Sequence, residues 1–206
     1  MTIAYELGNS LYINITNACP CNCTFCLRND ADSVNPNQSL WLEREPTIEE
    51  IQDALSQVLV QGDSNEASNK YREIVFCGYG EPTMRLDVLL EIGRFLKGIQ
   101  NRNRPIRLNT NGLSDLINKK QTAVLLAKCI DHISISLNAP NANDYNAMCD
   151  PMFGEGSFEA IIKFAKDCKR CIPEVTLSVV GHTLNTKDIE ACQALCDSLG
   201  IPMRVR

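Results

Sequence analysis

Long apolar runs are missing from this chain of 206 residues. No stretch approaches the roughly 20 consecutive apolar residues that a membrane-spanning helix needs, and the first residues lack the pattern of a secretory signal. Basic residues are not in excess, because the formal net charge is −5. That charge argues against nucleic-acid binding driven by the whole surface. We therefore expect a cytoplasmic protein with no membrane partner.

Histidine and tryptophan are also scarce, with two histidines and one tryptophan in the whole chain. Cysteine is not scarce, since the chain has eleven. Without an export signal, so many cysteines indicate a reducing compartment and metal chemistry rather than disulfides. The length and the 44% apolar share fit one domain, residues 1–206, with a substantial core.

The most informative motif is a run of cysteines directly after the first strand-like segment. Cys19, Cys23 and Cys26 have the spacing C-x3-C-x2-C, and the aromatic Phe25 precedes the last of them. Three thiolates hold three irons of a [4Fe–4S] cluster and leave the fourth iron open. An open iron can chelate a small molecule, so the motif indicates a cluster with a bound ligand.

Two other uses of these cysteines have to be weighed. Cys21 adds a fourth sulfur, so the segment has enough ligands for zinc, but no companion pair with flanking histidines follows. Disulfides would be strained at this density. If the motif holds a cluster, Cys21 is surplus, because one iron must stay open.

Strand and helix patterns alternate along the chain, which predicts parallel strands joined by right-handed crossovers. The fold class is therefore α/β. An open doubly wound sheet and an incomplete barrel both fit this pattern, and both place chemistry at the C-terminal ends of the strands. We expect strands at residues 11–15, 74–76, 106–108, 133–137, 175–180 and 203–206, and helices at 47–59, 86–96, 115–128, 158–168 and 189–199.

Polar motifs follow several of these strands. The second strand leads into Gly78-Tyr79-Gly80-Glu81-Pro82, in which glycine permits close backbone approach and Glu81 can bind an amine. An ordinary turn is the alternative for this segment, and a turn with Asn and Gly explains the next motif equally well. For the third motif the alternative is alternating solvent-facing polar residues on an edge strand. The third strand ends at Asn109, and the fourth carries Ser136 and Asn138 on one face.

Together these motifs resemble the radical SAM superfamily. The spacing C-x3-C-x-aromatic-C is similar to the family's cluster motif, and Gly-Tyr-Gly-Glu-Pro is similar to its G-G-E-P segment. The resemblance implies a partial TIM-like (β/α)6 barrel with parallel strands, a [4Fe–4S] cluster and S-adenosylmethionine (SAM) as cofactors. It also implies that Cys19, Cys23 and Cys26 ligate the cluster. The SAM contacts implied by the resemblance are Phe25, Gly78, Tyr79, Gly80, Glu81, Asn109, Ser136 and Asn138.

The resemblance further implies an enzyme that cleaves SAM reductively, with an external one-electron reductant, and abstracts hydrogen from a substrate. That substrate is unidentified; a small molecule, a polypeptide and a nucleic acid all fit. In its length and in the residues of its cysteine motif, the chain is most similar to small radical SAM proteins associated with TatD-type nucleases. It is also similar to the activating enzymes of glycyl radical proteins, which suggests an oxidoreductase of that kind.

The sequence contains fewer signals for residues that would contact a substrate. His182 follows the fifth strand, and Arg204 lies on the sixth with Arg206 on the same face. We expect His182 and Arg204 to face a substrate, and the polar loop 28–46 to cover or flank the opening. The alternative is a non-enzymatic Fe–S or zinc sensor or scaffold associated with a nuclease partner. Glu81 separates the two, because only an enzyme needs it beside the cluster.

Overall fold

Seven strands form one sheet, and all but the first run parallel. The structure is a computed structural model that describes residues 1–29, 33–35, 38–60, 70–99 and 104–206. The strand order is β1-β2-β5-β6-β7-β8-β9, with β1 antiparallel to β2 and every later pair parallel. The strands are β1 (Ala4–Leu7), β2 (Ser10–Ile13), β5 (Glu73–Phe76), β6 (Ile106–Thr110), β7 (His132–Ser136), β8 (Glu174–Val179) and β9 (Met203–Val205). A separate two-stranded sheet pairs β3 (Ser33–Asn35) with β4 (Gln38–Ser39).

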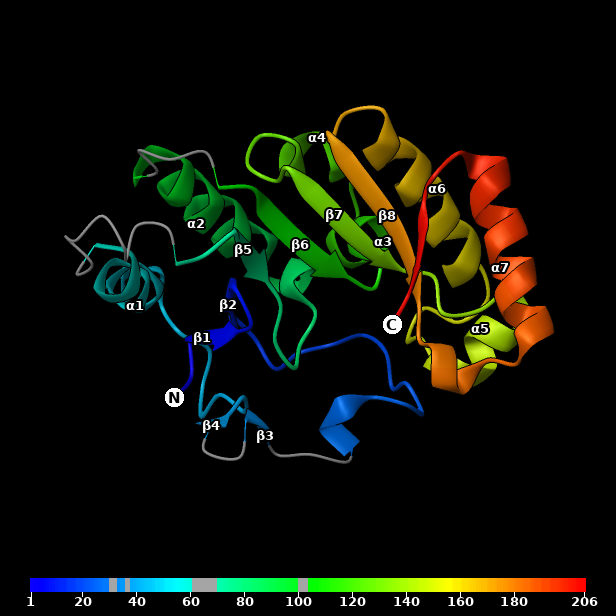
Figure 1. Cartoon of the computed structure of the whole chain (residues 1–206), viewed down its shortest axis with the longest axis horizontal. Helices are drawn as coiled ribbons and strands as arrows, with labels where there is room; N and C mark the ends of the chain where they lie inside the picture. Colours follow the sequence, from blue (N-terminus) through cyan, green and yellow to red (C-terminus); the bar gives the residue numbers. More distant parts are fainter. Residues whose placement is uncertain (30–32, 36–37, 61–69, 100–103) are drawn as a thin grey trace.

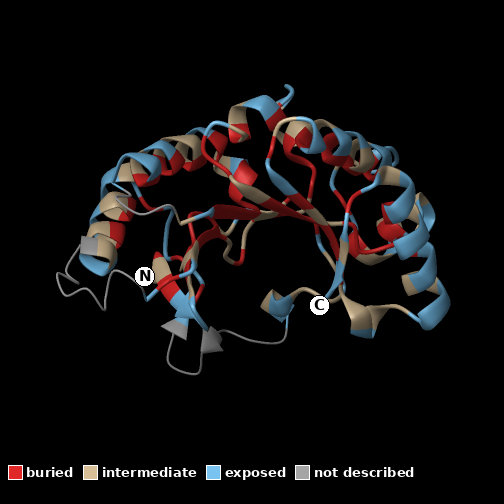
Figure 2. Ribbon diagram, turned by 45° about the horizontal axis from the view of Figure 1, so that its top comes forward, coloured by how far each residue is buried: buried red, intermediate tan, exposed pale blue. Residues whose placement is uncertain are grey.

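The helices cover the convex face of this curved sheet and leave its concave face open (Figures 1 and 2). The parallel strands follow one another in chain order, so the sheet has no reversal of the kind that a doubly wound sheet contains. The expected partial TIM-like (β/α)6 barrel is therefore confirmed. The helices are α1 (Ile48–Val60), α2 (Leu86–Ile99), α3 (Ser114–Asn118), α4 (Ala123–Leu126), α5 (Ala142–Cys149), α6 (Ser157–Lys169) and α7 (Thr186–Leu199).

Alternation along each strand separates an apolar face from a polar one. Ile74 and Phe76 on β5 are fully buried and belong to the main hydrophobic core, as do Ile133 and Ile135 on β7. Side chains at alternate positions point to opposite faces of a sheet. The remaining positions therefore face the concave side, and in β6, β7 and β9 they are polar or charged. This face is where a polar ligand can bind.

Helix α1 begins with a capping box formed by Thr47 and Glu50. The Glu50 carboxylate accepts a hydrogen bond from the Thr47 amide at 2.9 Å, and the Thr47 hydroxyl accepts one from the Glu50 amide at 3.3 Å. The two bonds satisfy amide groups that have no partner inside the helix. The helix expected at residues 47–59 is confirmed as α1.

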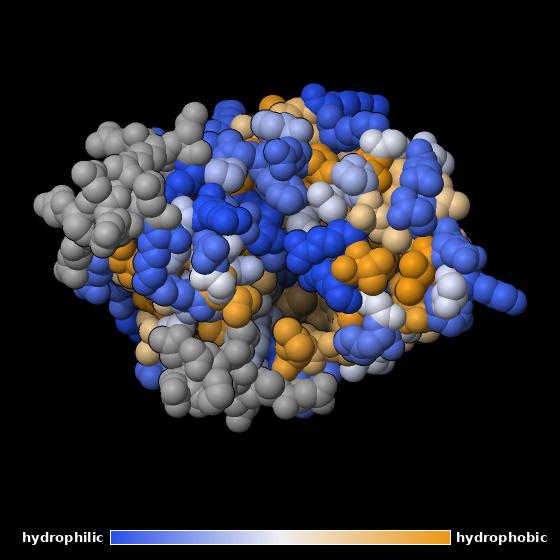
Figure 3. All heavy atoms as spheres, viewed as in Figure 1, coloured by the Kyte–Doolittle hydropathy of each residue, from blue (hydrophilic) through white to orange (hydrophobic). Residues whose placement is uncertain are grey.

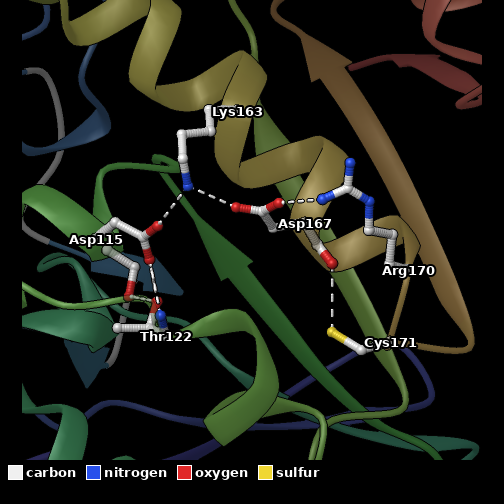
Figure 4. A network of polar contacts seen from close by, with 7 residues as sticks. Asp115, Thr122, Lys163, Asp167, Arg170 and Cys171 are labelled. Carbon is white, nitrogen blue, oxygen red and sulfur yellow. Dashed lines mark hydrogen bonds and ion pairs between the residues drawn. The ribbon is translucent and has the colours of Figure 1, made fainter.

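The single helix expected over residues 115–128 is wrong, because the chain breaks it into α3 and α4. Lys119 adopts a left-handed conformation, with φ of 52°, and ends α3. Asp115 then accepts two bonds from Thr122, from its amide and its hydroxyl, both at 2.8 Å (Figure 4). The same carboxylate also lies 3.8 Å from the amino group of Lys163 on α6. This ion pair connects the segment between α3 and α4 to α6.

Helix α5 and strand β1 are missing from the sequence prediction. Helix α5 has no clear apolar stripe, and its buried residues are Tyr145 and Cys149. Its start is marked instead by Asn141, whose side chain accepts a hydrogen bond from the Asp144 amide at 3.0 Å. In the part of the chain that the structure describes, no helix has both the length and the apolar character needed to cross a bilayer.

One ion pair stands out on the concave face. Arg107 donates to both carboxylate oxygens of Glu73, at 2.9 Å from Nε and 2.7 Å from a terminal nitrogen. Both side chains are largely buried, with 8% and 24% of their surfaces exposed. The pair ties β5 to β6 beneath the open side of the barrel.

Replacing Glu73 with Gln should destabilise the fold by on the order of 3 kcal/mol, because it leaves the Arg107 charge buried without its partner. Glu91→Gln is the matched control, since it breaks the exposed pair between Glu91 and Arg94 and should cost under about 1 kcal/mol. Denaturant unfolding of both variants measures the difference. Equal midpoints for the two variants would show that the Glu73–Arg107 pair has no such role.

Candidate functional site

The cysteine loop after β2 is attached on one side to the end of α5. The amide of Asn22 donates to the carbonyl of Cys149 at 3.1 Å, and the amide of Thr24 donates to Met148 at 2.9 Å. In return, the amide of Met152 donates to the Pro20 carbonyl at 2.8 Å. The last carbonyls of a helix have no partner within it, so they accept bonds from the cysteine loop.

On its other side the loop contacts the turn that follows β5. The amide of Glu81 donates to the Ala18 carbonyl at 2.9 Å. A Cβ atom at Gly80 would lie 2.3 Å from the Thr16 carbonyl oxygen, and one at Gly78 would lie 2.0 Å from the side chain of Asn14. Both glycines are therefore needed for contact with the chain leading into the cysteine loop. The prediction that they also approach SAM stays a prediction.

The Glu81 carboxylate is buried at the centre of this contact. Oε1 accepts bonds from the Thr83 amide at 3.1 Å, the Thr83 hydroxyl at 2.7 Å and the Thr110 hydroxyl at 2.8 Å. Oε2 accepts one from the Asn111 amide at 2.7 Å. Burial raises the pKa of Glu81, while these donors oppose that rise. Glu81 thus joins the ends of β5 and β6, and Oε2 keeps capacity for a further donor such as an amine.

Two thiols outside the motif act on the motif cysteines. Hydrogen bonding with the Cys149 thiol, and then with the Cys21 thiol, lowers the pKa of Cys23, and hydrogen bonding with Cys21 lowers the pKa of Cys19. Cys23 Sγ also lies 3.7 Å from the Cys149 carbonyl oxygen. Two of the three motif thiols are therefore favoured as thiolates. Cys21 and Cys149 keep their protons, because donation raises the pKa of each.

The third motif cysteine has a cationic neighbour. Arg28 donates from Nε to the Cys26 sulfur at 3.4 Å and from Nη1 to the Asn17 carbonyl at 3.2 Å. Its guanidinium lies 5.9 Å from the ring centre of Trp41, which meets Tyr79 edge-on with ring centres 5.1 Å apart. The described part of loop 28–46 thus returns along the cysteine segment. Its residues 30–32 and 36–37 lie outside the described chain, so its role as a cover stays a prediction.

Three predicted SAM contacts lie at the ends of β6 and β7. Asn109 accepts a bond from Arg107 at 2.8 Å, and Ser136 accepts one from Arg206 at 3.1 Å. Asn138 has a left-handed backbone, with φ of 61°, and donates to the Cys149 sulfur at 3.6 Å. Its side-chain oxygen is buried and has no hydrogen-bond partner among the described residues. An unpaired acceptor beside the cysteines fits a ligand with hydroxyl groups.

Phe25, His182 and Arg204 occupy different surroundings. Phe25 packs partly buried against the main core. His182 is exposed on a short 3-10 helix, Gly181–Thr183. Arg204 pairs in register with Ser178 of β8 and so shares its concave face. Their direct roles stay predictions.

The sequence analysis missed three contributors to the site. Cys149 was hidden because α5 itself was not predicted. Arg28 stands two residues after the last motif cysteine, a position where a cation can favour a thiolate, and that spacing is a readable signal. Asn111 donates to the Cys21 sulfur at 3.7 Å, a contact between distant segments that no local pattern encodes.

The cysteines away from the site have another role. None of the eleven forms a disulfide. Cys168, Cys192 and Cys196 are fully buried in the core, and burial raises the pKa of Cys192 to about 11 and of Cys196 to about 12. Buried neutral thiols of this kind serve as small core side chains.

The thiols of the loop fit a [4Fe–4S] cluster. Within the described ranges, no three side chains of His, Cys, Asp or Glu are grouped closely enough to hold one metal ion. A [4Fe–4S] cluster instead takes each thiolate on a separate iron. The lowered thiol pKa values and the unpaired Asn138 oxygen both fit a cluster with a polar ligand beside it.

Comparison with known proteins agrees with this geometry. A family model described as the radical SAM superfamily matches residues 13–196. The probable GTP 3′,8-cyclase of Methanocaldococcus jannaschii is 28% identical over 201 residues, which is 95% of this chain and 57% of that protein. The chain thus spans little more than half of this curated relative.

Solved structures share the fold. A radical SAM methyltransferase from Sphaerobacter thermophilus aligns with a TM-score of 0.64 at 18% identity, over 98% of this chain and 68% of that chain. Streptococcus suis SuiB bound to S-adenosylmethionine aligns with a TM-score of 0.67 at 17% identity, over 97% of this chain and 40% of that chain. At such identities the likeness concerns the fold alone.

Replacing Gly80 with Ala should separate the two loops, because the added Cβ would lie 2.3 Å from one carbonyl oxygen and 2.8 Å from another. We expect a loss of about 1–3 kcal/mol in unfolding free energy and faster hydrogen exchange of the Glu81 amide. Gly98→Ala is the control, since a Cβ there meets nothing within 4 Å and lies in helix α2. Unchanged exchange at Glu81 in the Gly80 variant would refute the proposed contact.

Proposed function

This chain belongs to the radical SAM superfamily, and from that premise we propose that it is an enzyme whose [4Fe–4S] cluster is ligated by Cys19, Cys23 and Cys26. A cluster held by these three thiols would supply one-electron chemistry from an external reductant, namely the reductive cleavage of SAM to a 5′-deoxyadenosyl radical for hydrogen abstraction from a substrate. The protein supplies orientation and shields the reaction from solvent. All of its contributions below come from residues of this chain.

The observation that carries the proposal is the attachment of the cysteine loop on both sides. One side hydrogen-bonds to the end of α5 and the other to the Gly78–Glu81 turn, through backbone groups. Both supports belong to parallel strands or to the segments that follow them, so the loop lies at the C-terminal end of the barrel. A loop fixed in this way presents its three thiols to one ligand before that ligand binds.

For SAM we propose the space between this loop and the ends of β5 to β7. The free capacity of Glu81 Oε2 suits the amino group of SAM, and the backbone near Gly80 lies alongside. The unpaired oxygen of Asn138 suits a ribose hydroxyl. Ser136 ends β7 two residues earlier, and the left-handed backbone of Asn138 places it beyond the strand, so the expected shared strand face is wrong. Phe25, Tyr79 and Asn109 complete the set of proposed contacts.

The proposed function does not specify the substrate or the partners. A small molecule, a polypeptide and a nucleic acid each fit an open barrel. The likeness to TatD-associated proteins and to activating enzymes of glycyl radical proteins stays a prediction, as does the cytoplasmic location, because none of the relatives named above carries those descriptions.

We predict that protein purified and reconstituted without oxygen holds about four irons per chain. Alanine at Cys19, Cys23 or Cys26 should remove that iron, whereas Cys21→Ala should retain it, because Cys21 donates a hydrogen bond instead of ligating. Iron analysis and electron paramagnetic resonance of the reduced protein measure both.

The same samples test the reaction. Reduced wild-type protein should form 5′-deoxyadenosine from SAM, and the three ligand variants should not. Tightly bound zinc in place of iron, or iron loss in Cys21→Ala equal to that of the ligand variants, would contradict the assignment.

A further inference from the structure

The concave face of the sheet carries more positive than negative charge. Arg107 on β6, Arg204 on β9 and Arg206 just beyond β9 all lie on this side. The register pairs Arg204 with Ser178, and Ser178 with Ser136. The guanidinium of Arg206 donates to the Ser136 hydroxyl at 3.1 Å. Figure 2 places the end of the chain beside the open concave side.

Two carboxylates on this face, Glu73 of β5 and Glu174 of β8, have basic neighbours on other strands. Glu73 accepts two bonds from Arg107 and one from the Ser10 hydroxyl at 2.8 Å, and Glu174 lies 4.0 Å from His132. In the described ranges no carboxylate side chain forms an ion pair with Arg204 or Arg206. The two guanidinium groups therefore share one strand face with no carboxylate side chain paired to either.

The neighbouring guanidinium groups affect the pKa of Arg206. Its pKa is lowered by the burial of its guanidinium and by the charges of Arg204 and Arg107, while Cys77 opposes the shift. A guanidinium beside other guanidinium groups is stabilised when an anion binds between them. The fork of N–H donors on each arginine matches a phosphate or a carboxylate.

Apart from Glu174, the other groups facing this site are neutral donors and acceptors. Burial and the charge of Arg107 lower the pKa of His132, whose Nε2 lies 3.1 Å from the Thr176 hydroxyl, so His132 adds no charge near pH 7. Glu174 reaches His132 at 4.0 Å from the exposed side. Burial also raises the pKa of Cys77, which stays protonated. Figure 3 shows a hollow on the face viewed in Figure 1, with hydrophilic side chains along its upper edge and hydrophobic ones below it and to its right.

We propose that Arg204 and Arg206 together bind an anionic group of the substrate, a phosphate or a carboxylate, on the concave face of the barrel. The proposal rests on the proposed function, and it narrows the substrate to a class, the anionic compounds. The two arginines are two residues apart on one strand, roughly 7 Å along it. Arg206 lies at the C-terminal end, beside Ser136, so the anion holds the substrate next to the proposed SAM site.

The test uses reconstituted protein saturated with SAM, with inorganic phosphate and succinate as the two probes in calorimetric titrations. Wild type should bind at least one probe, and the one bound more tightly identifies the anion as phosphate or carboxylate. The double variant Arg204→Ala with Arg206→Ala should lose at least tenfold in affinity, and the double lysine variant should recover part of it. Arg170→Ala, on the outer surface after α6, is the control and should bind as wild type does.

SAM affinity and 5′-deoxyadenosine formation are measured in the same samples. Unchanged SAM affinity in the double alanine variant supports a substrate site, whereas a matching loss would assign the arginines to the carboxylate of SAM and overturn the proposal. Failure of wild type to bind either probe, or equal binding by the double variant, also overturns it. Anion binding without any 5′-deoxyadenosine would leave the anion site standing and refute the proposed function instead.

Discussion

The backbone hydrogen bonds that fix the cysteine loop are the constraint on which the site depends. The Glu81 amide bonds to Ala18 on one side, and the carbonyls that end α5 accept bonds from Asn22 and Thr24 on the other. Three thiols on a free loop would have to be ordered by the ligand itself, at a cost in conformational entropy. Here the sheet and one helix have already restricted the loop, and Gly80 is what allows them to approach.

The same attachment determines the chemical state of the thiols. Because the end of α5 reaches the loop, the Cys149 thiol lies where it can form a hydrogen bond with Cys23, and Cys21 does so within the loop. Hydrogen bonds to ligating sulfurs are among the features that set the potential of an iron–sulfur cluster. The surplus cysteine of the motif therefore lies beside the proposed ligands, and α5 supplies a second such thiol.

The sequence carried the parts of this site that depend on local spacing. The positions of Cys19 and Glu81 after consecutive strands were predictable, because parallel strands bring their C-terminal ends to one edge. Cys149 was not, since the polar sequence of α5 lacks an apolar stripe and hides the helix that carries it. The break at Lys119 was missed for a related reason: apolar spacing continues across it, and a side-chain bond from Asp115 decides the outcome. Contacts between distant segments leave no pattern in a single sequence.

The central claim is that three cysteines ligate the cluster and that SAM binds the remaining iron. Electron–nuclear double resonance of the reduced protein, with SAM labelled with ¹⁵N in its amino group, tests this directly. The account predicts a hyperfine coupling from the label in wild type and in Cys21→Ala. A spectrum that does not respond to labelled SAM in either protein would contradict it.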